Sequence, residues 1–181
     1  MTFDRIVDGI IAREGGFSDH PSDRGGATMY GITEAVARAN GYQGDMRRLP
    51  RELAEAIYRD RYWTGPNFHR IAGISEKVAE EVADSGVNFG PTVPSVWLQR
   101  WLTALNRQGR DYPDLRPDGA VGPVTLAALR SFIDKRGKPG EAVLVAALNC
   151  TQGTRYLELA EGRRANEEFL YGWLRERVLA A

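Results

Sequence analysis

Apolar residues recur at helical spacing along most of the chain. In the opening segment they fall at positions i, i+3, i+4, i+7 and i+8, which predicts an amphipathic helix through Phe3, Ile6, Val7, Ile10 and Ile11. Gly15 and Gly16 are expected to end it. The glycine-rich stretch that follows is too long for a simple turn, and its loose alternation over residues 28–33 predicts a short strand or hairpin edge.

Further helices are expected along the rest of the chain, each from an apolar stripe with a start or stop residue. They cover residues 33–39, 50–64, 75–87 and 96–105, and then 121–133, 141–160 and 165–178. Residues 106–119 are polar and rich in turn formers, which indicates a linker or a long loop. We therefore expect a first lobe over residues 1–106 and a helical second lobe over residues 107–181 that shares its core.

Composition narrows the classes of partner. The chain of 181 residues holds 24 basic and 24 acidic residues, so no overall field favours nucleic acid or an anionic membrane. Apolar residues make up 43% of the chain, enough for a core, and no apolar run reaches the roughly 20 residues of a membrane-spanning helix. The single cysteine, Cys150, is expected to be buried, and neither histidine has carboxylates at metal-ligand spacing. No metal or cofactor is expected.

Glu14 is a carboxylic acid at the end of the apolar face of the first helix. Helical geometry advances about 100° per residue, so Glu14 lies within roughly 20° of the directions of Phe3 and Val7. The last turn of a helix and partial burial both disfavour an ionised carboxylate and so raise a carboxyl pKa. A carboxyl group protonated near neutral pH can donate a proton to a leaving-group oxygen, as cleavage of a glycosidic bond requires. The alternative is a helix-end carboxylate turned to solvent.

Glycoside cleavage also needs an ionised carboxylate that stabilises the sugar cation or activates water. Asp19 and Asp23 lie in a polar loop that would keep them charged, and Thr28 supplies a hydroxyl that can orient a water. Asp19 is expected at the surface, and a turn-forming role for Asp23 is the alternative to catalysis. The distance between the carboxyl groups decides between inversion and retention, so both stay open, as does a transglycosylase that uses Glu14 alone.

The segment 14–33 resembles the signature of glycoside hydrolase family 108. The residues that carry the resemblance are Glu14, Gly15, Gly16, Phe17, Asp23, Gly25, Gly26, Thr28, Gly31, Ile32 and Thr33. It implies a peptidoglycan muramidase, or lysozyme, with a mainly α, lysozyme-like helical fold and a small β element near residues 17–32. The order Glu14, Asp23, Thr28 is similar to the Glu, Asp, Thr triad of phage-type lysozymes, although the second step is five residues here and six there. Tyr30 is therefore the alternative for the role of Thr28.

The resemblance extends to IYRDRYW at residues 57–63, DSGVNFGP at 84–91 and FLYGWLRERV at 169–178. Substrate contacts are expected at Tyr30, Tyr62, Asp84 and Asn88, with the alternative that Asp84 and Asn88 tie the end of their helix. Residues 117–129, PDGAVGPVTLAAL, are similar to peptidoglycan-binding modules. The same residues also suffice for a turn and a helix start, so a binding role and a folding role both stay open.

We therefore expect a bacteriolytic glycoside hydrolase, either a phage endolysin or a bacterial wall-remodelling enzyme. It would cleave the β-1,4 bond between N-acetylmuramic acid and N-acetylglucosamine in peptidoglycan, with Glu14 as general acid and with Asp23 and Thr28 as further catalytic residues. The alternatives are a non-catalytic peptidoglycan-binding or secretion-assisting protein and a helical interaction protein. The expected partner is the glycan strand, with no nucleic acid, no membrane insertion and a monomeric chain. The N-terminal residues do not form a signal peptide, so we expect synthesis in the cytoplasm and action on the wall after release or non-classical export.

Overall fold

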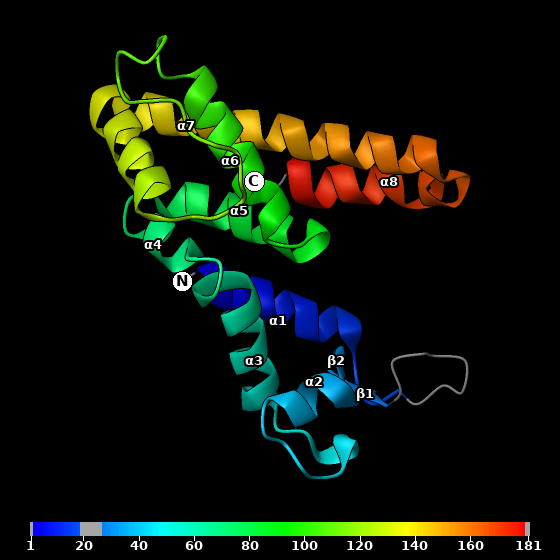
Figure 1. The fold of residues 1–181 in the computed structure, drawn as a ribbon. Helices are drawn as coiled ribbons and strands as arrows, with labels where there is room; N and C mark the ends of the chain where they lie inside the picture. Colours follow the sequence, from blue (N-terminus) through cyan, green and yellow to red (C-terminus); the bar gives the residue numbers. More distant parts are fainter. Residues whose placement is uncertain (1, 19–26, 180–181) are drawn as a thin grey trace. The chain divides into compact units, whose positions relative to one another are not determined.

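The computed structural model describes residues 2–18 and 27–179, and of Thr2, Arg13 and Glu14 it describes the backbone alone. Helices make up most of the described chain, with a small two-stranded antiparallel sheet beside them (Figure 1). This confirms the expected mainly α, lysozyme-like fold with a small β element. The chain divides into two compact units, the N-terminal unit Met1–Gly65 and the C-terminal unit Pro66–Ala181.

In the N-terminal unit, helix α1 (Thr2–Glu14) packs on helix α3 (Arg51–Arg59) because each helix presents an apolar face. α3 continues into a π-helical turn, η2 (Asp60–Thr64), where the ring of Trp63 stacks on Phe3 at a centroid distance of 4.8 Å. The buried residues of the two helices are Phe3, Val7, Ile10, Ile11, Ala54, Ile57 and Tyr58. Two exposed ion pairs join the rims of the helices, Asp4 with Arg59 and Asp8 with Arg51.

The β element is a hairpin of β1 (Thr28–Met29) and β2 (Ile32–Thr33), with Thr28 opposite Thr33. Its two turn residues, Tyr30 and Gly31, both have positive φ, at 54° and 74°, as a type I′ turn requires. Helix α2 (Glu34–Ala39) follows directly, and the hydroxyl of Thr33 caps it by accepting a hydrogen bond from the N–H of Val36 at 3.3 Å. A 3₁₀ turn, η1 (Met46–Arg48), then leads to α3.

The C-terminal unit is built around three helices, α5 (Glu76–Phe89), α6 (Thr92–Ala104) and α7 (Pro123–Gly162). The short helix α4 (Phe68–Ala72) packs on α5. The chain ends in η3 (Arg164–Asn166), α8 (Glu167–Trp173) and η4 (Leu174–Val178). Fully buried side chains that fill this core include Phe68, Val78, Val82, Leu98, Leu102, Leu129, Leu144 and Leu148.

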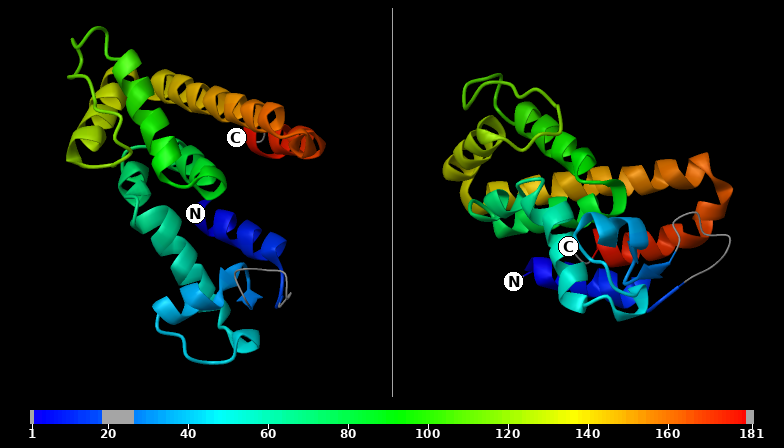
Figure 2. Two further views of the ribbon diagram at one scale, coloured as in Figure 1. Left: turned by 45° about the vertical axis from the view of Figure 1, so that its right-hand side comes forward. Right: turned by 60° about the horizontal axis from the view of Figure 1, so that its bottom comes forward.

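α7 is two helices joined at a sharp bend, which Figures 1 and 2 show between its yellow and orange parts. The bend lies at Gly137, whose φ of 58° and ψ of −155° are not helical, and Pro139 follows it. α8 runs back along the second segment of α7 and contacts it. Two separate helices were expected here, over residues 121–133 and 141–160, and the bend separates them.

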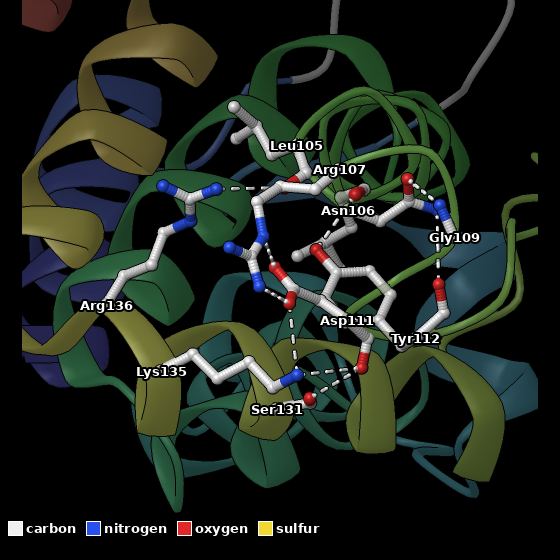
Figure 3. A network of polar contacts seen from close by, with 10 residues as sticks. Leu105, Asn106, Arg107, Gly109, Asp111, Tyr112, Ser131, Lys135 and Arg136 are labelled. Carbon is white, nitrogen blue, oxygen red and sulfur yellow. Dashed lines mark hydrogen bonds and ion pairs between the residues drawn. The ribbon is translucent and has the colours of Figure 1, made fainter.

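The loop between α6 and α7 is packed against the helices on both sides of it. Its anchor is Asp111, whose carboxylate accepts hydrogen bonds from Arg107 at 2.5 and 3.0 Å and from Lys135 at 3.0 Å (Figure 3). The hydrogen bonds from Arg107 are the main cause that lowers the pKa of Asp111 to about 2. Buried Asn106 holds the same loop, since its amide donates to the Asp114 carboxylate at 2.7 Å and accepts from the N–H of Gly109 at 2.9 Å.

The Asp118-Gly119 turn has a structural role in this loop. The Asp118 carboxylate accepts hydrogen bonds from the N–H of Ala120 and from buried Gln99, each at 2.9 Å. Those two bonds lower the pKa of Asp118. Gly119 has a φ of 77°, and a Cβ there would lie 2.5 Å from Cγ2 of Thr92. Only glycine fits this turn without strain.

The expected lobe boundary near residue 106 falls inside the C-terminal unit, at the start of the packed loop. The division into lobes 1–106 and 107–181 stays a prediction. Among the helices that the structure describes, none is both long enough and apolar enough to cross a membrane.

Candidate functional site

Glu14 is the last residue of α1. The helix ends there because Gly15 takes a left-handed conformation, with a φ of 73°, while its N–H still donates to the carbonyl of Ile11 at 3.1 Å. Phe3 and Val7, which share the helical azimuth of Glu14, are only 4% and 3% exposed. The backbone of Glu14 therefore lies at the C-terminal end of the buried stripe of α1.

The segment after Glu14 is joined to the hairpin by a β-bridge between Ser18 and Thr28. The N–H of Ser18 donates to the carbonyl of Thr28 at 3.0 Å, and the N–H of Thr28 donates to the carbonyl of Ser18 at 2.8 Å. Ser18 and Thr28, which flank residues 19–27, are therefore hydrogen-bonded neighbours. Thr28 thus lies across from a residue only four positions after Glu14. Asp19 and Asp23 lie outside the described residues.

The hydroxyl of Thr28 is close to the same bridge. It donates to the carbonyl of Ser18 at 3.5 Å, at the long limit of a hydrogen bond, and the residue is half-buried. A contact this long leaves the hydroxyl able to turn toward another acceptor or a water.

Tyr30 and Tyr62 are linked through a third tyrosine, Tyr58. The hydroxyl of Tyr58 donates to the backbone carbonyl of Tyr30 at 2.9 Å, and its ring stacks on that of Tyr62 at a centroid distance of 6.2 Å. Both Tyr30 and Tyr62 are half-buried. The structure therefore connects the hairpin turn to η2 through Tyr58, which is itself buried in the core.

Arg47 is a further side chain next to this segment. Its guanidinium carbon lies 4.5 Å from the centre of the Phe17 ring, a cation–π distance, and joins η1 to the stretch between Glu14 and the bridge. No sequence argument singled it out, because the short stretch 45–48 shows only an acidic cap, Asp45, and two arginines in a row. The arginine is exposed, so its charge also faces solvent.

Asp84 and Asn88 lie on α5, in the C-terminal unit. Asp84 forms an ion pair with Arg177 of η4, and its other oxygen accepts from the amide of Gln152 at 3.2 Å. Asn88 donates to the backbone carbonyl of Asp84 at 2.9 Å. Both side chains therefore hold α5 within its own unit, as in the alternative in which they tie the end of their helix. Their contact with substrate stays a prediction.

A buried acid next to Asp84 was missed by sequence reasoning. Glu81 is only 5% exposed, and its Oε1 has no hydrogen-bond partner in the part of the chain that the structure describes. Burial, with a smaller effect of the Asp84 charge, raises the pKa of Glu81 to about 8, while Ser85 and Asn149 act in the opposite direction. The available signal was its spacing of three residues from Val78 on the apolar face of α5.

Two family models match the chain. Residues 7–90 match the family described as Glycosyl hydrolase 108, and residues 93–178 match the family described as Predicted Peptidoglycan domain. The structure of SagA from Brucella abortus is similar, with a TM-score of 0.61 and 25% sequence identity over 99% of this chain and 94% of that chain. No protein of curated function matches the chain at a significant level.

The matches define the class of the protein as a peptidoglycan-acting glycosidase. Residues 7–90 are similar to glycosyl hydrolase family 108, and residues 93–178 are similar to the peptidoglycan domain family. The resemblance stated from residues 14–33 and 117–129 is confirmed. The hydrolase match extends past Gly65, so α4 and α5 belong to it by sequence and to the C-terminal unit by packing.

Proposed function

We propose that the protein is an N-acetylmuramidase that hydrolyses the β-1,4 bond between N-acetylmuramic acid and N-acetylglucosamine in peptidoglycan. Glu14 is the general acid of this proposal. The observation that carries it is the position of Glu14, at the C-terminal end of α1 and in line with the buried residues Phe3 and Val7.

This position suits a proton donor for two physical reasons. The C-terminal end of a helix carries partial negative charge, which disfavours a second negative charge beside it. In this proposal the Glu14 carboxyl group continues the apolar stripe of α1, where its ionised form would be poorly hydrated and therefore disfavoured. A neutral acid retained near neutral pH can protonate the glycosidic oxygen as the bond to the sugar breaks.

The second carboxyl group in the proposal is Asp23, and the hydroxyl that orients the attacking water is Thr28. The bridge between Ser18 and Thr28 supports this pairing, because it brings the two ends of the segment that contains Asp23 next to the end of α1. An ionised carboxylate and an oriented water are the remaining requirements of hydrolysis.

The test is the release of reducing ends from purified peptidoglycan by wild type and by Glu14→Gln. We expect the variant to fold normally and its kcat to fall about a thousandfold or more. The reason is that glutamine cannot donate the proton and also changes the charge at the site. Glu52→Gln is the matched control, because Glu52 is exposed on α3 and makes no ion pair within the described ranges. It should keep the wild-type rate.

Mass spectrometry of the products separates the reaction types. Reducing N-acetylmuramic acid ends are expected, whereas 1,6-anhydro ends would mark a transglycosylase. Near-full lysis by Glu14→Gln would reject Glu14 as the acid. If the wild-type protein bound sacculi but released no reducing or anhydro ends, the protein would be a non-catalytic wall-binding protein.

A further inference from the structure

A groove runs between α6 and the second segment of α7, inside the C-terminal unit. Its volume is about 520 Å³, in the range of small-molecule sites. It is lined by Val93, Trp97, Arg100, Trp101, Cys150, Thr151, Thr154, Arg155 and Glu158. All of these residues lie within the peptidoglycan domain match at 93–178 and far in sequence from Glu14.

One wall of the groove is a single face of α6. Trp97, Arg100 and Trp101 follow Val93 at i+4, i+7 and i+8, which places them side by side on a helix. Trp97 is 8% exposed and packs edge-on against Phe89 at a centroid distance of 5.5 Å. These contacts hold the aromatic wall in place.

The opposite wall is the side of α7 that carries Thr151, Thr154 and Arg155. The indole N–H of Trp101 donates to the hydroxyl of Thr151 at 2.9 Å, so one hydrogen bond spans the floor between the two helices. Cys150 also lines this wall. It was expected to be buried, and that expectation is wrong, because Cys150 is exposed on the groove side of α7.

The charge in the groove is unbalanced. Arg155 donates to the carboxylate of Glu158 at 2.9 Å, so those two charges compensate one another. Arg100 is exposed and makes no hydrogen bond or ion pair with any residue in the ranges 2–18 and 27–179. The guanidinium of Arg100, on the same helix face as Trp97 and Trp101, is therefore available to bind an anion.

Guanidinium groups bind carboxylates through two parallel hydrogen bonds. Tryptophan faces offer apolar contact to aliphatic groups and sugar rings next to such a carboxylate. In peptidoglycan the stem peptides carry free carboxylates, whereas the N-acetylated glycan with amide-linked lactyl groups is uncharged. The chemistry of the groove thus favours the peptide part of the polymer over the glycan alone.

We propose that this groove binds the carboxylate-bearing stem peptide of peptidoglycan, with Arg100 pairing with a carboxylate and with Trp97 and Trp101 packing against the adjoining apolar groups. The proposal rests on the proposed function only in taking peptidoglycan as the ligand, and it does not depend on Glu14. The groove is a binding site separate in sequence from the catalytic segment.

The test uses Cys150 as a reporter, because it lines the groove and is the single cysteine of the chain. The full chain carrying Glu14→Gln is treated with a maleimide, alone and with either of two probes. The probes are N-acetylglucosaminyl-N-acetylmuramoyl tetrapeptide and the peptide-free tetramer of N-acetylglucosamine. We expect the tetrapeptide at saturation to slow labelling about fivefold or more and the tetramer to leave the rate unchanged.

Two further variants in the same background locate the anion contact. Arg100→Gln should weaken protection by the tetrapeptide about tenfold in apparent Kd, whereas Arg130→Gln should leave it unchanged. Arg130 is the matched control, because it is an exposed arginine on the first segment of α7 and does not line the groove. Thermal unfolding by circular dichroism verifies that each variant folds.

Two outcomes would overturn the proposal. One is equal protection by the tetramer with Arg100→Gln unaffected, which would make the groove a glycan site. The other is an unchanged rate of Cys150 labelling with millimolar tetrapeptide, which would show that the groove does not bind the stem peptide. Both readouts are independent of bond cleavage, so failure of the Glu14 assignment would show in the reducing-end assay and not here.

Discussion

The hydroxyl of Tyr58 donates a hydrogen bond to the backbone carbonyl of Tyr30 at 2.9 Å, and so fixes the hairpin turn to α3. Tyr58 itself is only 7% exposed and forms part of the core between α1 and α3. The hairpin starts at Thr28, which is bridged to the segment that follows Glu14. One buried phenol thus connects the core of the N-terminal unit to the backbone of the candidate site.

Tyr58→Phe should lower the free energy of unfolding by about 1 kcal/mol, because a partly buried carbonyl loses its donor while the ring still packs. Chemical denaturation measures this change. Tyr62→Phe is the matched control, since the hydroxyl of Tyr62 makes no hydrogen bond within the described chain. Equal stability of Tyr58→Phe and wild type would show that the hydrogen bond contributes nothing net.

Thr28→Val should lower kcat by about tenfold to a hundredfold if the hydroxyl orients the attacking water, since a misplaced nucleophile slows the chemical step. Valine keeps the branched shape and the backbone bridge to Ser18, so stability should change little. Thr28→Ser keeps the hydroxyl and should retain most of the activity. Loss of activity in both variants alike would assign Thr28 a packing role.

Glu81→Gln should remove a pH dependence from the stability of the C-terminal unit. The folded chain holds a proton on Glu81 up to a pKa of about 8, whereas the unfolded chain releases it near 4.5. The folded state therefore binds more protons between these values, and the free energy of unfolding falls as pH rises from about 4.5 to 8. At pH 7 the glutamine variant should be more stable by about 3 kcal/mol, from 1.36 kcal/mol for each unit of pKa shift.

Urea denaturation of wild type and Glu81→Gln at several pH values between 5 and 8 measures this effect. Asp84→Asn is the companion variant, because the Asp84 charge adds to the raised pKa of Glu81. It should end the fall in stability at a lower pH and make the fall smaller, because the fall still begins near 4.5, even though the variant also removes the partner of Arg177. Parallel pH profiles of wild type and Glu81→Gln would show that Glu81 ionises freely in the folded chain.

Gly119→Ala should destabilise the chain by about 2 kcal/mol, because the φ of 77° strains any residue with a Cβ and the added methyl meets Thr92 at 2.5 Å. Gly122→Ala in the same loop is the control, since a Cβ there has no atom within 4 Å and its φ is negative. The midpoint of thermal unfolding measures both. Similar midpoints for the two variants would mean that the loop shifts to admit the methyl group.

The helices could largely be predicted from sequence because their signals are local. The stripe through Phe3 and Val7, the cap at Thr33 and the stop at Gly15 all lie where these residues indicated, since each acts on neighbours within one turn. The resemblance of residues 14–33 also identified the family. Glu14 and Thr28 came from the same short segment, and their assignment to catalysis remains for the assays above.

The features that sequence reasoning missed depend on contacts between distant residues. The polar stretch after residue 106 was expected to be a linker or a long loop, and it is a loop, but its anchoring by Gln99 and Asn106 depends on hydrogen bonds to Asp118 and Asp114 that the sequence does not show. Trp97 and Trp101 lie in the helix expected over residues 96–105, and only the packing of α6 beside α7 places them with Arg100 along a groove. The buried state of Glu81 likewise follows from helices that pack over it.

The hydrolase match ends at residue 90 and the peptidoglycan domain match begins at residue 93, but the boundary between the two compact units lies at Gly65. α5 therefore belongs to the hydrolase match by sequence and packs with the helices of the peptidoglycan domain match. Its side chains Val78, Val82 and Ser85 are buried in that unit. A chimera that exchanged the peptidoglycan domain at residue 92 would divide the hydrophobic core that α5 shares with α6 and α7. A junction between Gly65 and Pro66 would transfer the whole C-terminal unit, including α4 and α5, and would leave its core intact.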